Sequence, residues 1–381
     1  MPPRSLRRGD KCPNPGAVHK GCSRPKALRF DSPLGGPSVF GTGQYSGNIM
    51  QGGIALQPQD YLLDGITPLS ACIVYTGAAT VAPDALTGAA VFSCRNLVGI
   101  GASASLSTST NCKGLLGFVR GLTALRNGAH LHMDKLGKAG NFGDISPVNL
   151  VGTDLLLRLN RTALSRFVVH GEGGYGASRN GGNAGQGCDA PSCGPMQTGG
   201  GGSGSFNDQS GWWESWSGAG GKGGPCCGGA SSASFSSSGA GHFGDDAGPY
   251  GGPGGNPPAN AAYGGTAGQG DPPGTTTGGN YANVAPCAGG GLLMLFSSAF
   301  DNGAGCVMSA DGAPGQAQLR YAGSAATGSG GTGGGCTVLV TKRGGYTNKG
   351  TVRASGGAGG YPSSSQRGGN GAPGSVNIFE V

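Results

Sequence analysis

One stretch of the chain, residues 251–280, sets the strictest limit on what this sequence can fold into. It reads GGPGGNPPANAAYGGTAGQGDPPGTTTGGN, and Tyr263 is its only bulky apolar side chain. Such a segment cannot be stabilised by burying side chains, so any ordered structure in it must rest on hydrogen bonds between backbone amides and carbonyls. The alternative is a flexible low-complexity linker.

Glycine recurs at every third position in several parts of the chain. The sets are Gly218, Gly221 and Gly224; Gly248, Gly251 and Gly254; and Gly368, Gly371 and Gly374. A polyproline II helix has three residues per turn and no internal hydrogen bonds, so glycines at this spacing share one face and let neighbouring backbones approach. Ordering glycine is entropically unfavourable, and the scattered prolines reduce that cost by fixing φ in advance. The spacing therefore predicts polyglycine or polyproline II helices packed side by side.

The glycines are unevenly distributed along the chain. Residues 171–381 contain 62 of the 85 glycines, and residues 1–170 contain the other 23. Eight of the 25 Lys and Arg residues, against one acid, fall within residues 1–30. We therefore expect a basic N-terminal arm over residues 1–40, a β-rich attachment domain over residues 41–170, and a glycine-rich domain over residues 171–381.

Apolar residues in the first 170 positions come in short runs bounded by Gly, Pro, Asn and Ser, which is typical of strands. The dipeptide Asn127-Gly128 is a strong tight-turn signal between two alternating segments. After it, Leu131 and Met133 are expected on one strand face, with His130 and His132 on the other. Such a histidine pair suits a metal site or, as we favour here, a solvated strand face. The run at residues 153–171 is ambiguous between helix and strands, and its β-branched end favours strands.

A repeated unit is visible in the glycine-rich half. Residues 289–315 and 333–360 both begin with three glycines, continue with an apolar strand, a turn and a second short strand, and end in a glycine tract. The offset between them is about 45 residues, and residues 118–140 and 153–176 follow the same plan more loosely. A unit that cannot bury its own apolar face is expected to stack on its copies. The predicted fold is mostly β with polyglycine/polyproline II helices, an N-terminal β-rich domain followed by a glycine-rich layered domain, and almost no α-helix.

No stretch approaches the 18 or more continuous apolar residues of a membrane span, so we expect no membrane insertion. The first 16 residues are basic without an apolar region, so we expect no secretory signal and synthesis in a cytoplasm. The basic arm is better explained by docking on a partner than by nucleic acid, because no groove-reading motif accompanies it.

The chain has an even number of cysteines, and a glycine-rich chain with a thin core gains from cross-links. We expect disulfides formed after release from the cell, with several free thiols as the open alternative. The candidates are Cys12, Cys22, Cys72, Cys94, Cys112, Cys188, Cys193, Cys226, Cys227, Cys287, Cys306 and Cys336. A zinc site is not expected, because no C-x-x-C pair occurs and the histidines lack finger spacing.

No catalytic motif is present, and we expect neither an enzyme nor a cofactor or metal. The stretch SFNDQSGWWESWSG instead concentrates aromatic side chains, including every tryptophan of the chain. Aromatic rings flanked by polar groups suit sugar or protein-surface binding, and they equally suit a local core. The candidate binding residues are Phe206, Trp212, Trp213 and Trp216, extended by Tyr250, Tyr263 and Tyr281.

The sequences GLTALRNGAHLHMDKLGKAG, TNKGTVRASGGAGG and GGNGAPGSVNIFEV resemble the glycine-rich tail-fibre and receptor-binding proteins of tailed bacteriophages. The resemblance covers residues 115–381 and is one of pattern. In related tip adhesins, polyglycine helices stack into a sandwich and the loops between them form the receptor-binding surface. The two strand units and the alternating C-terminal strand depart from that compact plan.

The resemblance implies a virion protein that is made in a host cytoplasm and becomes extracellular on lysis. Its implied partners are other virion proteins, copies of itself with a trimer favoured, and a host surface glycan or protein. The alternative is a secreted glycine-rich protein that binds ice or the cell wall. That alternative calls for a secretory signal and, for ice, a long flat face of small residues.

Overall fold

The computed structural model of the chain describes residues 39–137 apart from 64, 66 and 86, and residues 289–315, 331–359 and 370–381. It also gives the backbone of four short strands: β11 (Val168–His170), β12 (Met196–Thr198), β15 (Ala317–Gln318) and β16 (Thr327–Gly328). Within these residues every regular element is a strand and none is a helix. The prediction of a mostly β chain is confirmed for the described part.

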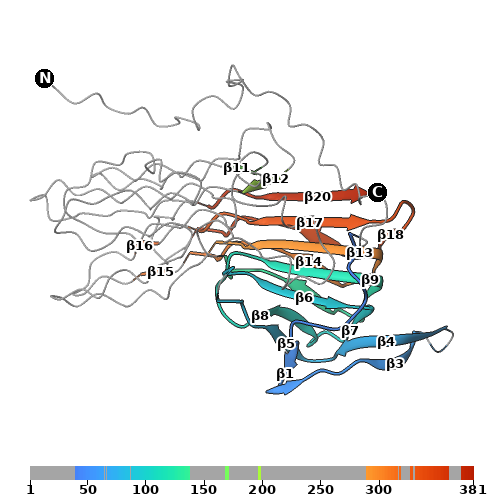
Figure 1. Cartoon of the computed structure of the whole chain (residues 1–381). Coiled ribbons are helices and arrows are strands. Elements are labelled where there is room, and N and C mark those ends of the chain that lie inside the picture. The colour runs from blue at the N-terminus through green and yellow to red at the C-terminus, as the bar shows by residue number, and fades with distance from the viewer. Residues whose placement is uncertain are drawn as a thin grey trace, which may run out of the picture.

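Nine strands form the largest sheet, which we call the large sheet (Figure 1). Its order is β20 (Ser375–Glu380), β17 (Cys336–Thr341), β13 (Leu292–Asn302), β9 (Leu115–Arg126), β7 (Asn96–Ile100), β4 (Thr67–Tyr75) and β3 (Gln59–Leu63). In addition, β6 (Ala90–Cys94) pairs with β9 and β18 (Tyr346–Asn348) pairs with β13. All these pairs are parallel except β3 with β4.

Seven shorter strands form the small sheet. Its order is β19 (Thr351–Arg353), β14 (Val307–Ser309), β10 (His130–His132), β8 (Ser105–Thr108), β5 (Ala78–Val81), β1 (Met50–Gln51) and β2 (Ile54–Ala55). The pairs from β19 to β5 are parallel, and β1 is antiparallel to both β5 and β2. The antiparallel strands β1, β2 and β3 thus lie at one end of both sheets.

The chain adds to both sheets in turn. Each pass of the chain consists of one strand in the large sheet followed by one strand in the small sheet. The passes are β4 with β5, β7 with β8, β9 with β10, β13 with β14, and β17 with β19, and we call each pass a rung. The turn at Asn127-Gly128 joins the two strands of one rung, and both residues have positive φ, 55° and 85°. The predicted turn is confirmed, but it connects the two sheets instead of closing a hairpin.

The stacking of the repeated unit is confirmed. Leu292 pairs with Cys336 in the large sheet, and Val307 pairs with Thr351 in the small sheet. Both pairs are separated by 44 residues, since 336 − 292 and 351 − 307 give the same difference. The looser copy also takes part, because β9 and β10 pair in parallel with β13 and β14. Rungs from residues 41–170 and from residues 171–381 therefore share the same two sheets.

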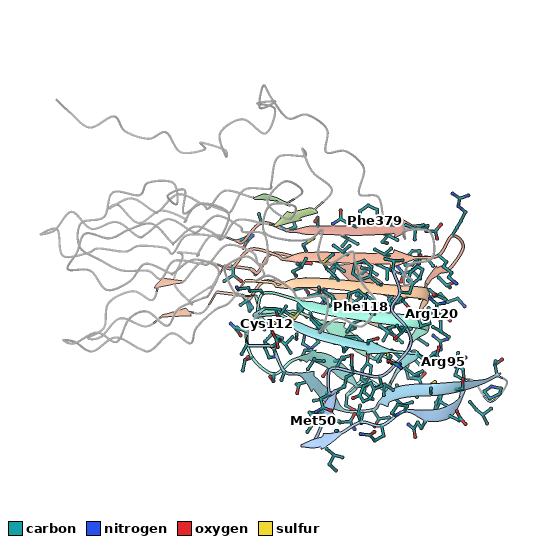
Figure 2. The ribbon with its side chains drawn as sticks, in the orientation of Figure 1. Met50, Arg95, Cys112, Phe118, Arg120 and Phe379 are labelled. Atoms are coloured by element: carbon teal, nitrogen blue, oxygen red, sulfur yellow. The ribbon has the colours of Figure 1, made fainter. Side chains whose placement is uncertain are left out.

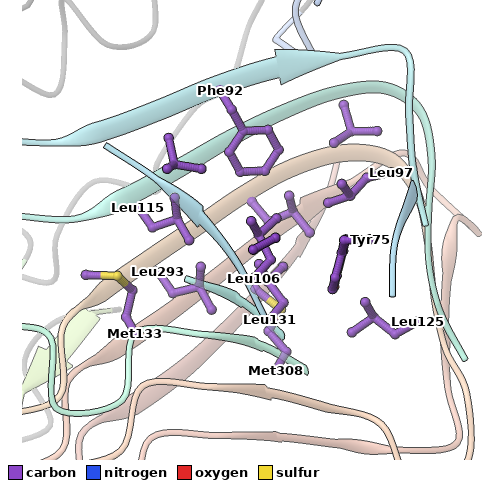
Figure 3. Packing of buried hydrophobic residues seen from close by; sticks show 14 of the residues in the cluster. Tyr75, Phe92, Leu97, Leu106, Leu115, Leu125, Leu131, Met133, Leu293 and Met308 are labelled. Atoms are coloured by element: carbon purple, nitrogen blue, oxygen red, sulfur yellow. The ribbon is translucent and has the colours of Figure 1, made fainter. Parts of the chain in front are cut away.

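The main core lies between the two sheets (Figure 3). It contains Tyr75, Phe92, Leu106, Leu131 and Leu293, each no more than 1% exposed. Leu131 and Met133 both point into this core, while His130 and His132 on the other face are half-buried. The predicted division of that strand into an apolar and a polar face is confirmed, but the predicted solvation of the polar face is not, because both histidines are half-buried and the Nδ1 of His132 is buried.

The other face of the large sheet is also apolar and buried. Phe118 and Phe296, which are register partners in β9 and β13, stack with ring centroids 5.0 Å apart and planes 4° apart. Phe40, from the segment that precedes β1, packs in the same cluster. Identical side chains at equivalent positions of adjacent rungs thus stack directly on each other.

Candidate functional site

The chain leaves and rejoins the two sheets on the side where the strands of the large sheet begin. Six described segments lie there: residues 133–137, 289–291, 310–315, 331–335, 354–359 and 370–374. We call them the junction. They precede or follow the three stretches 138–288, 316–330 and 360–369, which hold most of the glycine-rich sequence. The junction is thus where the glycine-rich stretches are joined to the rungs.

The junction segments are held together by backbone hydrogen bonds that run in several directions. The segment 331–335 shows this best, because it bonds to four other segments. Thr332 N donates to Ala313 O (3.0 Å), Gly334 N to Ala372 O (2.8 Å) and Gly335 N to Ala310 O (2.8 Å), while Gly290 N donates to Gly333 O (3.0 Å) and Gly357 N to Thr332 O (2.8 Å). A strand in a sheet bonds to two neighbours at most, so this segment is hydrogen-bonded in more directions than a strand.

Several positions in the junction have no space for a side chain and therefore require glycine. A Cβ built on Gly335 would overlap the carbonyl oxygen of Gly291, and one on Gly374 would overlap that of Gly335. A Cβ on Gly331 would likewise overlap the carbonyl oxygen of Gly357. In each case the obstacle is rigid backbone of a neighbouring segment. The sequence rule that glycines permit close backbone approach therefore applies here.

A carboxylate ladder fixes one side of the junction to the small sheet. Asp134 accepts hydrogen bonds from the Ser309 hydroxyl (2.8 Å) and from the backbone N–H of Asp311 (2.6 Å). One rung further on, Asp311 accepts from the Arg353 Nε (2.6 Å) and from the backbone N–H of Ser355 (2.7 Å). The two aspartates occupy equivalent positions, because the strands before them pair in register. Each aspartate thus binds its own rung to the next.

Sequence reasoning missed this ladder. The signal was present in HLHMD (130–134) and VMSAD (307–311), where an aspartate follows each short strand at the same position. The two five-residue segments share only the aspartate, so aligning them by residue identity does not reveal that they are equivalent. Only the parallel pairing of β10 with β14 shows that the two aspartates are equivalent.

The histidine pair lies beside the ladder. His130 and His132 are edge to face with ring centroids 6.5 Å apart, and the Nδ1 of His132 is 3.8 Å from Asp134 Oδ2. Burial lowers the pKa of His132, and the negative charge of Asp134 partly opposes that shift. Nδ1 is buried without a hydrogen-bond partner among the described residues. The described residues contain no group of three or more metal-binding side chains in ligating proximity.

A row of exposed basic side chains borders the opposite, turn side of the large sheet. Arg95 and Arg120 lie close together there (Figure 2). Their backbones are tied across adjacent strands, since Gly121 N donates to Arg95 O (2.7 Å) and the Ser298 hydroxyl donates to Arg120 O (2.6 Å). Lys342 continues the row on the next rung through its N–H to Ser298 O (3.2 Å). The row is a positively charged border of the large sheet.

Five of the cysteines lie in the described residues. Cys72, Cys94, Cys112, Cys306 and Cys336 are thiols, and no disulfide joins any two of them. Each is at most 1% exposed and packs among apolar side chains, where a thiol behaves as a small hydrophobic group. Burial raises the pKa of the Cys72 and Cys94 thiols. In this structure the five thiols fill the core and link no strands, which matches the alternative of free thiols, and the disulfide hypothesis stays a prediction.

The other cysteine candidates lie outside the described residues: Cys12, Cys22, Cys188, Cys193, Cys226, Cys227 and Cys287. The aromatic binding candidates also lie outside them: Phe206, Trp212, Trp213, Trp216, Tyr250, Tyr263 and Tyr281. Residues 1–38 of the basic arm fall there too, as do residues 153–167 of the ambiguous run, whose end forms β11. These predictions remain predictions.

The described residues hold one hydroxyl bonded to a carboxylate, Ser309 with Asp134. Ser309 is 0% exposed. In the described part of the chain, no helix is long and apolar enough to cross a membrane. Comparison with known proteins finds no family model, no curated protein and no solved structure that matches this chain.

Proposed function

We propose that this chain is a non-enzymatic structural protein of a tailed-phage virion, a tail fibre or fibre-like adhesin. Its N-terminal part attaches it to the particle. The loops of its glycine-rich region bind the host surface or a neighbouring virion protein. The proposal rests on the sequence resemblance, and the junction is the structural observation that supports it.

The junction supports the proposal through its hydrogen bonding. The segment 331–335 bonds to four neighbours and has no room for a Cβ at Gly331, Gly334 and Gly335, and both features are expected of packed polyglycine II helices. We propose that the glycine-rich stretches continue this packing beyond the junction. Rungs then serve as a rigid base, and the glycine-rich region is a scaffold whose loops are free to vary in sequence.

A rigid scaffold with variable loops is a common arrangement for recognition, because loops tolerate substitution without loss of the fold. The tryptophan cluster Trp212, Trp213 and Trp216 is the proposed contact surface, together with Tyr250 and Tyr263. Large amphipathic rings lose little conformational entropy on binding and provide large contact area. The proposed ligand is a host surface glycan or protein, and the chain is proposed to act as a homo-oligomer among other virion proteins.

Location is the decisive test of this proposal. Electron microscopy of native virus particles, with antibody labelling of this chain, should place it on the tail or its fibres. Recovery of the native protein only from culture medium or cell wall, and never with particles, would overturn the proposal. That outcome would favour the alternative, a secreted glycine-rich ice-binding or cell-wall protein.

Binding by the aromatic cluster is tested on the purified full chain. Replacing Trp212, Trp213 and Trp216 together by Ala should reduce binding to host cells at least tenfold, because three aromatic contacts are lost. The control is Tyr61→Ala, a partly buried aromatic residue of β3 at the far end of the rungs. Equal binding by both variants would show that the tryptophans are not the contact surface.

A further inference from the structure

Neighbouring rungs of the large sheet are irregular at the same position, and basic residues occupy that position. Arg95 is the single residue between β6 and β7. In the next strand, β9 places two residues, Arg120 and Gly121, opposite the single Ser298 of β13. Lys342 comes directly after the end of β17. An extra residue in a strand lies outside the ladder of hydrogen bonds, and the strand bends there and redirects its side chain. We call Arg95, Arg120 and Lys342 the basic row.

The fold uses the backbone of the basic row and leaves its side chains without a partner. The carbonyl of Arg95 accepts a hydrogen bond from the Gly121 N–H (2.7 Å), and that of Arg120 accepts one from the Ser298 hydroxyl (2.6 Å). All three basic residues of the row are exposed. Within the described residues, no ion pair and no hydrogen bond engages their side chains. The fold therefore does not account for these charges.

Two other arginines show how the fold pairs a charge that it uses. Arg126 Nη2 lies 2.6 Å from Asp301 Oδ2, and Arg353 Nε lies 2.6 Å from Asp311 Oδ2. Each pair joins two adjacent rungs. Arginines that connect the rungs thus have carboxylate partners, whereas those of the basic row have none among the described residues.

Two acidic residues lie on strands that flank the row. Asp60 belongs to β3, which is separated from Arg95 by β4. Glu380 belongs to β20 and pairs in register with Thr341, one residue before Lys342. Within the described part of the chain neither carboxylate forms an ion pair with the row. The row therefore stays positive between these two strands.

The first two charges of the row lie side by side (Figure 2). A Cβ built on Gly43 would reach both residues, at 3.8 Å from Arg95 Cα and 3.2 Å from Arg120 Cβ. Strands in a sheet are about 4.8 Å apart, so the row spans roughly 14 Å from Arg95 to Lys342. Like charges on adjacent strands repel each other. A bound anion would offset that repulsion.

We propose that the basic row binds an acidic polysaccharide through sulfate, phosphate or carboxylate groups on its sugar units. A guanidinium group donates two parallel hydrogen bonds to such a group, and the two adjacent arginines can hold one group between them. An extended polymer with a negative group on each repeating unit continues along the row to Lys342. A single small anion would contact only the arginine pair.

The surroundings of the row favour a polysaccharide over other polyanions. Single-stranded nucleic acid is bound by aromatic side chains on which its bases stack. Tyr346, which follows the row in the chain, instead stacks on Phe300 with ring centroids 6.2 Å apart. A folded protein partner usually buries an apolar centre, whereas Gly121 and Ser298 lie between the charges of the row.

This site goes beyond the proposed function, which places recognition in the glycine-rich loops, and it does not depend on that function. Binding is measured on the purified chain. A negative result would leave the location test of the virion proposal unaffected. A chain that is never found on virus particles would still be expected to bind through the row.

The test uses fluorescein-labelled dextran sulfate, titrated with the full-length chain at low salt and followed by fluorescence anisotropy. Arg95→Gln/Arg120→Gln should raise the Kd roughly tenfold or more, because the charged hydrogen bonds of two guanidinium groups are lost. Lys135→Gln/Lys349→Gln is the matched control, since it removes two exposed charges outside the row, and it should raise the Kd less than about twofold. The basic residues of 1–30 are present in every variant and contribute equally to each titration.

Competing polymers define the ligand class. Neutral dextran should not displace the probe. Displacement by polygalacturonate would show that carboxylate groups are accepted, and its absence would restrict the ligand to sulfated or phosphorylated polysaccharides. An oligothymidylate or polyglutamate that displaces the probe as well as unlabelled dextran sulfate would overturn the assignment to a polysaccharide.

Circular dichroism and thermal unfolding of each variant show whether the fold is retained. A wild-type chain that does not bind dextran sulfate would overturn the proposal. Unchanged binding by Arg95→Gln/Arg120→Gln would overturn it as well, because the polymer would then bind elsewhere on the chain. Equal losses in the row variant and in the lysine control would mean that net charge alone, and not the row, determines binding.

Discussion

Gly335 lies where three junction segments meet, and its surroundings leave no space for a side chain. Its N–H donates to Ala310 O, and a Cβ would overlap the backbone of Gly290 and Gly291. Backbone cannot move aside as a flexible side chain can, so the segments would have to separate. At this position the choice of residue is decided by packing, although its φ is not in the left-handed region.

Gly335→Ala should therefore lower the free energy of unfolding by about 3 kcal/mol, in the upper range for overpacked sites. Urea unfolding followed by circular dichroism measures the change. Gly77→Ala is the matched control, because a Cβ there would meet only the Gln51 side chain at 3.6 Å. That control should change stability by less than about 1 kcal/mol. Equal effects of the two substitutions would contradict the packing argument.

His132 should make the free energy of unfolding depend on pH. Burial lowers the pKa of His132 in the folded chain, so the folded state binds a proton less readily than the unfolded state. As the pH falls below about 6.5, the ordinary pKa of histidine, the unfolded state gains protons first and the free energy of unfolding decreases. The loss continues until the pH has passed through the lowered pKa.

The measurement is urea unfolding between pH 7.5 and pH 5 for the wild-type chain and for His132→Gln. The variant should lose less stability over this interval, because the neutral side chain does not titrate. His130→Gln controls for removal of the neighbouring imidazole on the same strand face. Identical pH profiles for the wild type and His132→Gln would show that His132 does not carry the dependence.

At the scale of elements, the rungs are joined by side chains that repeat at equivalent positions. Phe118 stacks on Phe296 in the large sheet, and Phe300 stacks on Tyr346 with centroids 6.2 Å apart. On the polar side, Asp134 and Asp311 each bond to the next rung. The short strands β10, β14 and β19 have three residues each, so these side-chain contacts supplement few backbone hydrogen bonds.

Asp134→Ala should lower the free energy of unfolding by about 2 kcal/mol, because the buried Ser309 hydroxyl and the Asp311 N–H lose a charged acceptor. Amide hydrogen exchange should speed up first in β10 and β14. The control is Asp60→Ala, since that carboxylate accepts one exposed hydrogen bond of 3.4 Å from the Ala71 N–H. A loss under about 0.5 kcal/mol for Asp134→Ala would show that the ladder is not stabilising.

At the scale of the whole molecule, the described body holds together without disulfides. Its five cysteines are buried in three separate apolar clusters. Thiol titration should therefore give at least five reactive groups per chain in denaturant without reductant. The native chain should react far more slowly, because these thiols are buried and only the ionised form attacks the reagent. Fewer than five groups in denaturant would mean that at least one of these five cysteines forms a disulfide.

Much of this body could be predicted from patterns along the chain. Short apolar runs gave strands, Asn127-Gly128 gave a turn, and the shared plan of residues 289–315 and 333–360 gave stacked copies. These features are local, or they repeat at a fixed offset, so sequence reasoning reaches them. The equivalence of β9 with β13 was harder to establish, because their register partners Leu115 and Leu293 are 178 residues apart.

The sequence by itself determined that the described part of this chain is β-rich and repetitive, because alternation and repeat length are properties of neighbouring residues. Only the tertiary structure decided that rungs from both halves form one pair of sheets, that Asp134 and Asp311 are equivalent, and that the described cysteines are core residues. Those facts depend on which distant segments lie side by side, and parallel pairing across a long intervening stretch leaves no local trace in the sequence.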